Sequence, residues 1–125
     1  MEAVVATAIS VIAILGLAHS FGMGRAFIDR YAIARVALGV AQARMEGLSM
    51  LPPAAPDFSI GPHPDAPVVF TFQGAPVGTE QWLVEWFDDP STPLTTADLR
   101  RVTVVVAWSL GADQDSVRLA RLFQD

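Results

Sequence analysis

The first half of the chain carries a long apolar run. After Glu2 no charged residue occurs until Arg25, so residues 3–24 form a stretch of 22 uncharged and mostly apolar residues. As a helix, this stretch spans about 33 Å, close to the thickness of the hydrocarbon core of a bilayer. A helix that is apolar on every side lies either in a membrane or deep inside a protein. We therefore predict a membrane-spanning segment at residues 1–24; a helix buried in a soluble α+β domain and a cleaved signal peptide are the alternatives.

Residues 25–51 are predicted to continue this helix with one apolar face. Apolar residues recur there at alternating steps of four and three, the spacing of a helix that packs on one side. The positions concerned are Phe27, Tyr31, Ala34, Leu38, Ala41, Met45 and Leu48. We expect this stripe to pack on a sheet, with Phe27, Tyr31, Leu38 and Met45 at the contact.

Glycine and proline mark the ends of these segments. Gly22 and Gly24 favour a bend or local melting where the two halves of the helix meet, because each destabilises a helix relative to Ala. Pro52 and Pro53 end the helix near Leu51. Residues 52–67 contain six prolines and are predicted to form an extended loop.

Residues 68–125 are predicted to form a small antiparallel β domain. Runs of β-branched and aromatic residues separated by turn residues indicate four strands. The expected strands are Val68–Phe72, Trp82–Phe87, Val102–Trp108 and Ser116–Leu122, with an irregular connection over 88–99. Four successive strands favour a meander with one face covered by the helix, so the fold class is α+β. Trp82, Trp86 and Trp108 are expected on that covered face.

Composition narrows the possible functions. The chain is 52% hydrophobic and 17% charged, which excludes a disordered tail. Its net charge is −5 and it has eight Arg and no Lys, which argues against a nucleic-acid partner. The absence of Cys excludes disulfides and thiolate metal sites. Residues 1–50 carry a net charge of +1 and residues 51–125 one of −6, so the apolar half is also the less acidic half.

Candidate chemical groups are few. Asp88 with Asp89, and Asp113 with Asp115, are acidic pairs that could bind Ca²⁺ weakly, but turn and capping roles explain them, and we expect no metal site. His63 lies between two prolines and is expected to be a loop residue. Glu80 is expected on a solvent-facing side. No nucleophile motif or dinucleotide fingerprint occurs, so we expect no enzyme, no catalytic residue and no cofactor.

The layout and several segments resemble one family. Glu2 directly before AVVATAISVIAILGL is similar to the glutamate that opens the apolar helix of type IV pilins and pseudopilins. The segments AQARMEGLSMLP, WLVEWFDDP and DLRRVTVVVAW, followed by SVRLARLF, resemble minor pilins and minor pseudopilins. The resemblance covers most of the chain and is strongest at residues 2–24 and 99–122.

The resemblance implies assembly rather than catalysis. It implies that Glu2 pairs with the N-terminal amine of a neighbouring subunit while apolar helices pack in a filament core. Small residues on one helix face, Ala3, Ala6, Ser10 and Ala13, would let helices approach closely. The implied partners are other pilin or pseudopilin subunits of a type IV pilus or a type II secretion pseudopilus, together with inner-membrane lipid. The implied location is the inner membrane, with the C-terminal domain in the periplasm.

The chain departs from the family pattern at its start. Family members carry a short basic leader, which prepilin peptidase removes before the new terminus is methylated, whereas Glu2 here follows Met1. Either the true start lies upstream or the chain is not processed. Arg25 and the arginines after it would favour a cytoplasmic C-terminal side by the positive-inside rule, whereas the family exports this domain. A non-assembling membrane-anchored binding domain and a tight-adherence-type pseudopilin remain the alternatives.

Overall fold

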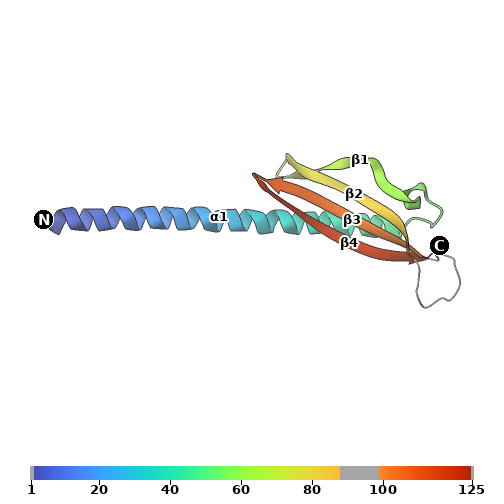
Figure 1. Ribbon diagram of the computed structural model, residues 1–125, viewed down its shortest axis with the longest axis horizontal. Coiled ribbons are helices and arrows are strands. Elements are labelled where there is room, and N and C mark those ends of the chain that lie inside the picture. Colours follow the sequence, from blue (N-terminus) through green and yellow to red (C-terminus); the bar gives the residue numbers. More distant parts are fainter. Residues whose placement is uncertain (1, 88–98, 125) are drawn as a thin grey trace. The chain divides into compact units, whose positions relative to one another are not determined.

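The computed structural model describes residues 2–87 and 99–124 and has an α+β fold (Figure 1). The elements are α1 (Glu2–Ser49), the short 3₁₀ helix η1 (Pro56–Phe58), β1 (Gly61–Phe72), β2 (Ala75–Phe87), β3 (Leu99–Leu110) and β4 (Asp113–Gln124). Contacts divide the chain into two units, Met1–Ile33 and Ala34–Asp125. The first unit consists of the N-terminal part of α1, and the second holds the rest of α1 and all four strands.

The first unit is helical throughout its described residues. Ala and Leu favour the helix, and the two hydroxyl residues near its start fit into it without competing for the backbone. Thr7 Oγ1 donates to the carbonyl of Ala3 at 2.7 Å, and Ser10 Oγ donates to the carbonyl of Ala6 at 2.9 Å. The helix assignment runs through Gly22 and Gly24 without a break, so the local melting that these glycines favour is not observed.

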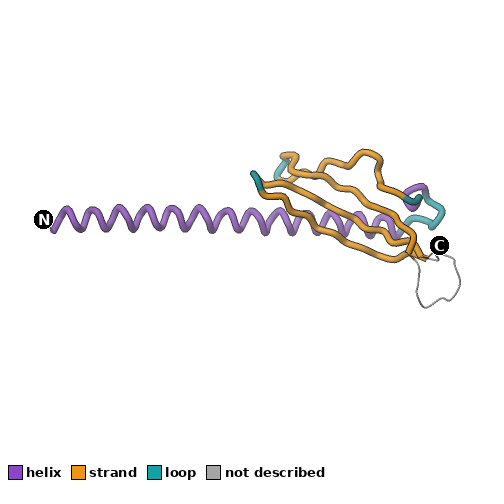
Figure 2. The backbone as a smooth tube through the Cα atoms, viewed as in Figure 1, coloured by secondary structure: helices purple, strands orange, loops and turns teal. Residues whose placement is uncertain are grey.

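The second unit contains a four-stranded antiparallel meander in the order β1-β2-β3-β4, as the sequence predicted (Figure 2). Every strand is longer than expected. β2 begins at Ala75, ahead of the expected Trp82, and β1 begins at Gly61, inside the predicted Pro-rich loop. Proline is tolerated there because β1 is an edge strand, where one side of the backbone needs no partner. Most of the predicted 88–99 connection lies outside the described residues.

Within this unit, the C-terminal part of α1 packs on one face of the sheet. Ala37, Ala41, Met45 and Leu48 are buried on the helix side. On the sheet side the buried residues include Val84, Val102, Val104 and Val106, which point to the same face because side chains alternate along a strand. After Ser49 the amides of Met50 and Leu51 bond three residues back, and Pro52 prevents the helix from continuing.

The helix face that packs differs in part from the predicted one. Met45 is buried as expected, but Phe27, Tyr31 and Leu38 are exposed, at 57%, 71% and 38%. The buried stripe runs instead through Ile33, Ala37 and Ala41, at steps of four. The two stripes share Ala41, Met45 and Leu48 and diverge toward the N-terminus. The prediction continued the stripe through Leu38, Tyr31 and Phe27, whereas the helix buries the adjacent stripe through Ala37 and Ile33.

The three tryptophans differ in their exposure to solvent. Trp82 and Trp108 are buried, as predicted, whereas Trp86 is 48% exposed. Trp86 lies one residue from the end of β2, and the guanidinium of Arg100 lies 5.2 Å from its ring centroid. Trp86 is therefore partly covered by Arg100 and is not a core residue.

Candidate functional site

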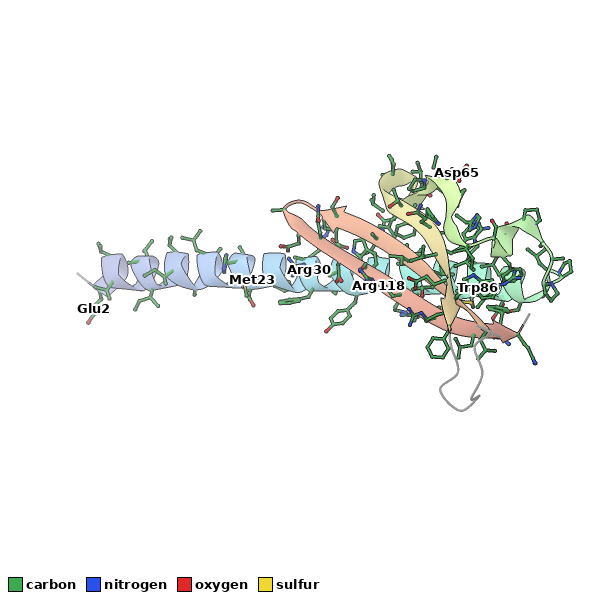
Figure 3. All side chains as sticks on the ribbon, turned by 45° about the vertical axis from the view of Figure 1, so that its right-hand side comes forward. Glu2, Met23, Arg30, Asp65, Trp86 and Arg118 are labelled. Carbon is green, nitrogen blue, oxygen red and sulfur yellow. The ribbon has the colours of Figure 1, made fainter. Side chains whose placement is uncertain are left out.

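The most unusual surface of the molecule is the N-terminal part of α1. Every residue from Glu2 to Tyr31 is exposed, including large apolar side chains such as Val4 and Ile12. Met23 is another of these exposed apolar side chains (Figure 3). An 18-residue window of this helix has a mean hydropathy of 2.1, and none of it is buried. The helix is long and apolar enough to cross a membrane. An apolar surface of this size needs lipid or a protein partner to cover it.

The polar groups of this helix are compatible with an apolar environment. An unbonded hydroxyl is costly to transfer out of water. Thr7 and Ser10 avoid that cost because each donates its hydroxyl hydrogen to a backbone carbonyl one turn back. Both hydroxyls keep an oxygen that can still accept a hydrogen bond. The helix is thus able to enter lipid without losing these bonds.

The predicted assembly residues lie on this exposed helix. Ala3, Ala6, Ser10 and Ala13 share one face because they are spaced by three and four residues. Ala8 lies on the opposite face. Glu2 is exposed at the start of the helix and is its only acidic residue in the first turn. The contact of these residues with another chain stays a prediction.

A second feature joins α1 to the sheet inside the second unit. Arg44 of α1 forms an ion pair with Glu80 of β2, Nε to Oε1, at 2.5 Å. The Arg44 guanidinium also lies 5.0 Å from the ring centroid of Trp82. Glu80 is only 7% exposed, so the expectation of a solvent-facing Glu80 was wrong. The alternation that places Trp82 and Val84 on the covered face also places Glu80 there.

Trp82 also contacts the segment that precedes β2 in the chain. Its indole Nε1 donates to the carbonyl of Asp57 at 3.1 Å, and the ring of His63 stacks on it with centroids 5.9 Å apart. His63 Nε2 donates to the carbonyl of Ser59 at 2.7 Å, since a carbonyl can only accept. His63 therefore fixes the chain after η1 against β2, and it lies in β1 rather than in a loop.

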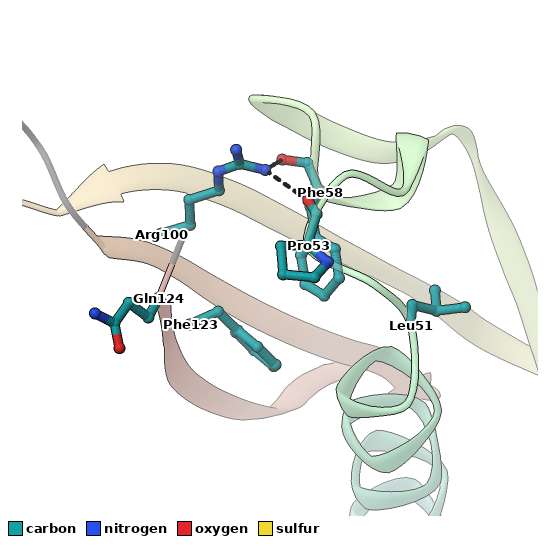
Figure 4. Close-up of a pocket in the computed structure, with 6 residues that line it drawn as sticks. All are labelled: Leu51, Pro53, Phe58, Arg100, Phe123 and Gln124. Atoms are coloured by element: carbon teal, nitrogen blue, oxygen red, sulfur yellow. Dashed lines mark hydrogen bonds between the residues drawn. The ribbon is translucent and has the colours of Figure 1, made fainter.

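The remaining chemical candidates are acidic residues near the turns and a small pocket beside the end of α1. Residues 2–87 and 99–124 contain no group of three or more His, Asp or Glu that could hold a metal ion. Asp88 and Asp89 lie outside those residues, and Asp115 accepts a hydrogen bond from the Ser116 amide. A pocket bounded by Phe58, Arg100 and Phe123 has a volume of about 30 Å³, enough for a single water (Figure 4). Arg100 Nη1 donates there to the carbonyls of Pro53 and Phe58, so its role is to hold the chain that follows α1.

Two features therefore stand out. One is the exposed apolar part of α1, and the other is the set of contacts among Arg44, Glu80 and Trp82 that joins the C-terminal part of α1 to the sheet. No known family model matches the chain, and neither a curated protein nor a solved structure does.

Proposed function

We propose that the chain is a pilin-like subunit, of the minor pilin or minor pseudopilin kind, that is anchored in a membrane and assembles through α1. The observation that carries this proposal is the run of 30 consecutive exposed residues from Glu2 to Tyr31. The sheet does not need this segment, because the rest of α1 already supplies the buried Ala37, Ala41 and Met45. An apolar helix that its own domain does not cover is available for lipid and for other helices.

The distribution of small residues supports assembly over a plain anchor. Without a hydrophobic force between helices in lipid, membrane helices associate through close backbone approach and polar contacts. Ala3, Ala6 and Ala13 allow close approach on one face, and the Ser10 oxygen on that face can accept a hydrogen bond. The resemblance to pilins adds a role for Glu2, which would pair with the N-terminal amine of a neighbouring subunit and set the axial register.

The second unit would then present the surfaces that distinguish this subunit from others. Within this unit, the Arg44–Glu80 ion pair joins the C-terminal part of α1 to β2. In this proposal the sheet lies in the periplasm and the neighbours are other pilin or pseudopilin subunits. No step of the proposed function is catalytic.

The first experiment tests the anchor. The full chain in its native cells should pellet with membranes, resist extraction at alkaline pH and dissolve in a mild detergent. Recovery in the soluble fraction without detergent would contradict both the anchor and the assembly role.

The second experiment tests assembly. Glu2→Gln should leave the chain in the membrane but shift it from large complexes to the monomer on a sucrose gradient in mild detergent. Glu46→Gln is the matched control, because Glu46 is an exposed acid on the same helix outside the apolar segment. Unchanged complexes in Glu2→Gln would favour the alternative of a non-assembling membrane anchor.

A further inference from the structure

The two edges of the sheet differ in their ability to accept another strand. The β1 edge contains Pro62, Pro64 and Pro67, which have no amide hydrogen, and its register with β2 shifts between His63 and Val68. Prolines and bulges of this kind block edge-to-edge pairing. β4 has neither, and it pairs with β3 in one unbroken register from Leu99↔Gln124 to Leu110↔Asp113. Among the described residues, β4 is thus the edge that remains suited to strand addition.

The open backbone groups of β4 can be identified from two contacts. The carbonyl of Ala107 in β3 is turned toward β2, because it lies 1.9 Å from where a Cβ of Gly78 would be. The backbone groups of one residue point to the same side of an antiparallel strand, so Ala107 and its β4 neighbour Ser116 are a pair without mutual hydrogen bonds. Accordingly, the Ser116 amide is turned away from β3 and bonds to Asp115 Oδ1 at 2.8 Å.

The alternation then assigns the rest of the edge. Val117, Leu119 and Arg121 bond to β3, and the amides and carbonyls of Arg118, Ala120 and Leu122 face away from it. Asp115 caps the Ser116 amide, which bounds this open run at its N-terminal end. We call the backbone of Arg118, Ala120 and Leu122 the open edge.

The charges beside the open edge have one sign. Residues 116–124 contain Arg118 and Arg121 and no acid, although the chain as a whole has a net charge of −5. The Arg121 guanidinium bonds to Ser49 Oγ at 2.8 Å and lies over the Phe123 ring. Arg118 is exposed and has no ion pair among the described residues. Leu122, which is 45% exposed, adds an apolar contact next to these cations.

We propose that the open edge of β4 binds an extended segment of a different protein, in which acidic and apolar residues alternate, as a fifth strand of the sheet. The backbone hydrogen bonds would supply affinity, and Arg118 would select for acid. The two edges of the sheet cannot pair with each other between copies, because the prolines of β1 prevent it from adding to the β4 edge of a second copy.

A second copy is also excluded through β4 itself. Symmetric pairing of two β4 edges would bring Arg118 and Arg121 of one copy beside the same two cations of the other, and like charges on adjacent strands repel. The binding of an acidic strand does not depend on the proposed membrane anchor, so the two proposals can fail separately.

A peptide experiment on the full chain in detergent micelles tests the proposal. The probe is a fluorescent nine-residue peptide of alternating Glu and Val, and the control peptide has Lys in place of Glu. Binding of the Glu peptide should raise its fluorescence anisotropy and should slow hydrogen exchange of the backbone amides of Arg118, Ala120 and Leu122. The Lys peptide should bind more weakly. Absence of Glu-peptide binding, or equal binding of both peptides, would overturn the proposal.

Two variants sharpen the result. Ala120→Pro removes an amide of the open edge without removing a bond to β3 and should weaken Glu-peptide binding about tenfold, whereas Ala120→Thr, which keeps the amide, should not. Arg118→Glu leaves the backbone intact and should reverse the preference between the two peptides, which tests the proposal even where Ala120→Pro fails to fold. Protection of the open edge that rises with the concentration of the chain alone would identify a second copy as the occupant and overturn the proposal.

Discussion

Gly78 marks a point where the sheet has no room for a side chain. A Cβ at this position would lie 1.9 Å from the Ala107 carbonyl oxygen and 2.7 Å from Trp108 Cα. Both atoms belong to the backbone of β3 and cannot rotate away. Any larger residue must therefore push β2 and β3 apart.

Gly78→Ala is expected to lower the free energy of unfolding by about 3 kcal/mol, because both strands must shift to admit the methyl group. Gly39→Ala is the matched control. Gly39 lies in α1, and beyond its chain neighbours and the adjoining helix backbone nothing lies within 4 Å of where a methyl group would be, so Ala should stabilise the helix by about 1 kcal/mol. Urea unfolding of the full chain in detergent, followed by tryptophan fluorescence, measures both. Equal stability of the two variants would contradict the close approach at Gly78.

The ion pair between Arg44 and Glu80 should respond asymmetrically to substitution. Arg44→Met leaves a carboxylate that is nearly buried without its partner, which should cost about 3 kcal/mol. Glu80→Gln should cost about 1 kcal/mol, because the amide oxygen still accepts from Arg44 and the Arg44 side chain, 37% exposed, can reach water. The same urea unfolding assay distinguishes them. A larger loss in Glu80→Gln than in Arg44→Met would contradict this description of the pair.

At the scale of elements, the sequence predicted the strands better than the packing of the helix. The run of β-branched residues in 102–106 predicted β3, and the alternation of side chains along that strand places Val102, Val104 and Val106 on its buried face. The start of β1 was missed because proline usually breaks strands, and only the position of β1 at an edge makes Pro62 and Pro64 acceptable. That position depends on tertiary structure and is not encoded locally.

The helix face was only half predictable for a related reason. Periodicity identified Ala41, Met45 and Leu48, but it also assigned Phe27 and Tyr31 to the packing face, and both are exposed. Ala37 is buried while its neighbour Leu38 is exposed, because the sheet covers the stripe that continues in steps of four residues, and the choice between two adjacent apolar stripes is made by tertiary packing. The Arg44–Glu80 pair was missed because two charged residues on different elements carry no local pattern.

Ala41→Leu tests the close packing of α1. Ala41 is fully buried, so the added atoms should force the helix away from the sheet and cost about 2 kcal/mol. Ala43→Leu places the same side chain at an exposed position of the same helix and should change stability by less than about 0.5 kcal/mol. Thermal unfolding followed by near-ultraviolet circular dichroism compares the two. Similar stability of both variants would mean that α1 lies farther from the sheet than described.

At the scale of the whole molecule, the two units differ in how far each one buries its own apolar side chains. The second unit has its own buried core, whereas residues 2–31 of the first unit are all exposed, including their large apolar side chains. The apolar run was readable from the sequence because its length and its lack of charge suffice. The proposed partners of this run were not readable in the same way, because helix packing between chains would leave no trace within one chain beyond small residues on one face.

The membrane anchor predicts a strong effect of one charge. Ile12→Arg places a charge in the middle of the apolar run and should weaken insertion by about 3 kcal/mol, releasing part of the chain at alkaline pH. Val69→Arg, at an exposed position of β1, should leave membrane retention unchanged. Equal retention of both variants would indicate that residues 3–24 do not enter the hydrocarbon core.

The central claim is that one face of the apolar helix contacts other subunits, and a photo-crosslinking scan tests it most directly. The chain has no Cys, so single cysteines at successive positions from Ala3 to Leu17 can each carry one short diazirine in native membranes. Crosslinks to protein should be strongest at Ala3, Ala6, Ser10 and Ala13 and weakest at Ala8, with a period of about 3.6 residues. A uniform profile, or crosslinks to lipid alone at every position, would contradict the assembly of this subunit through α1.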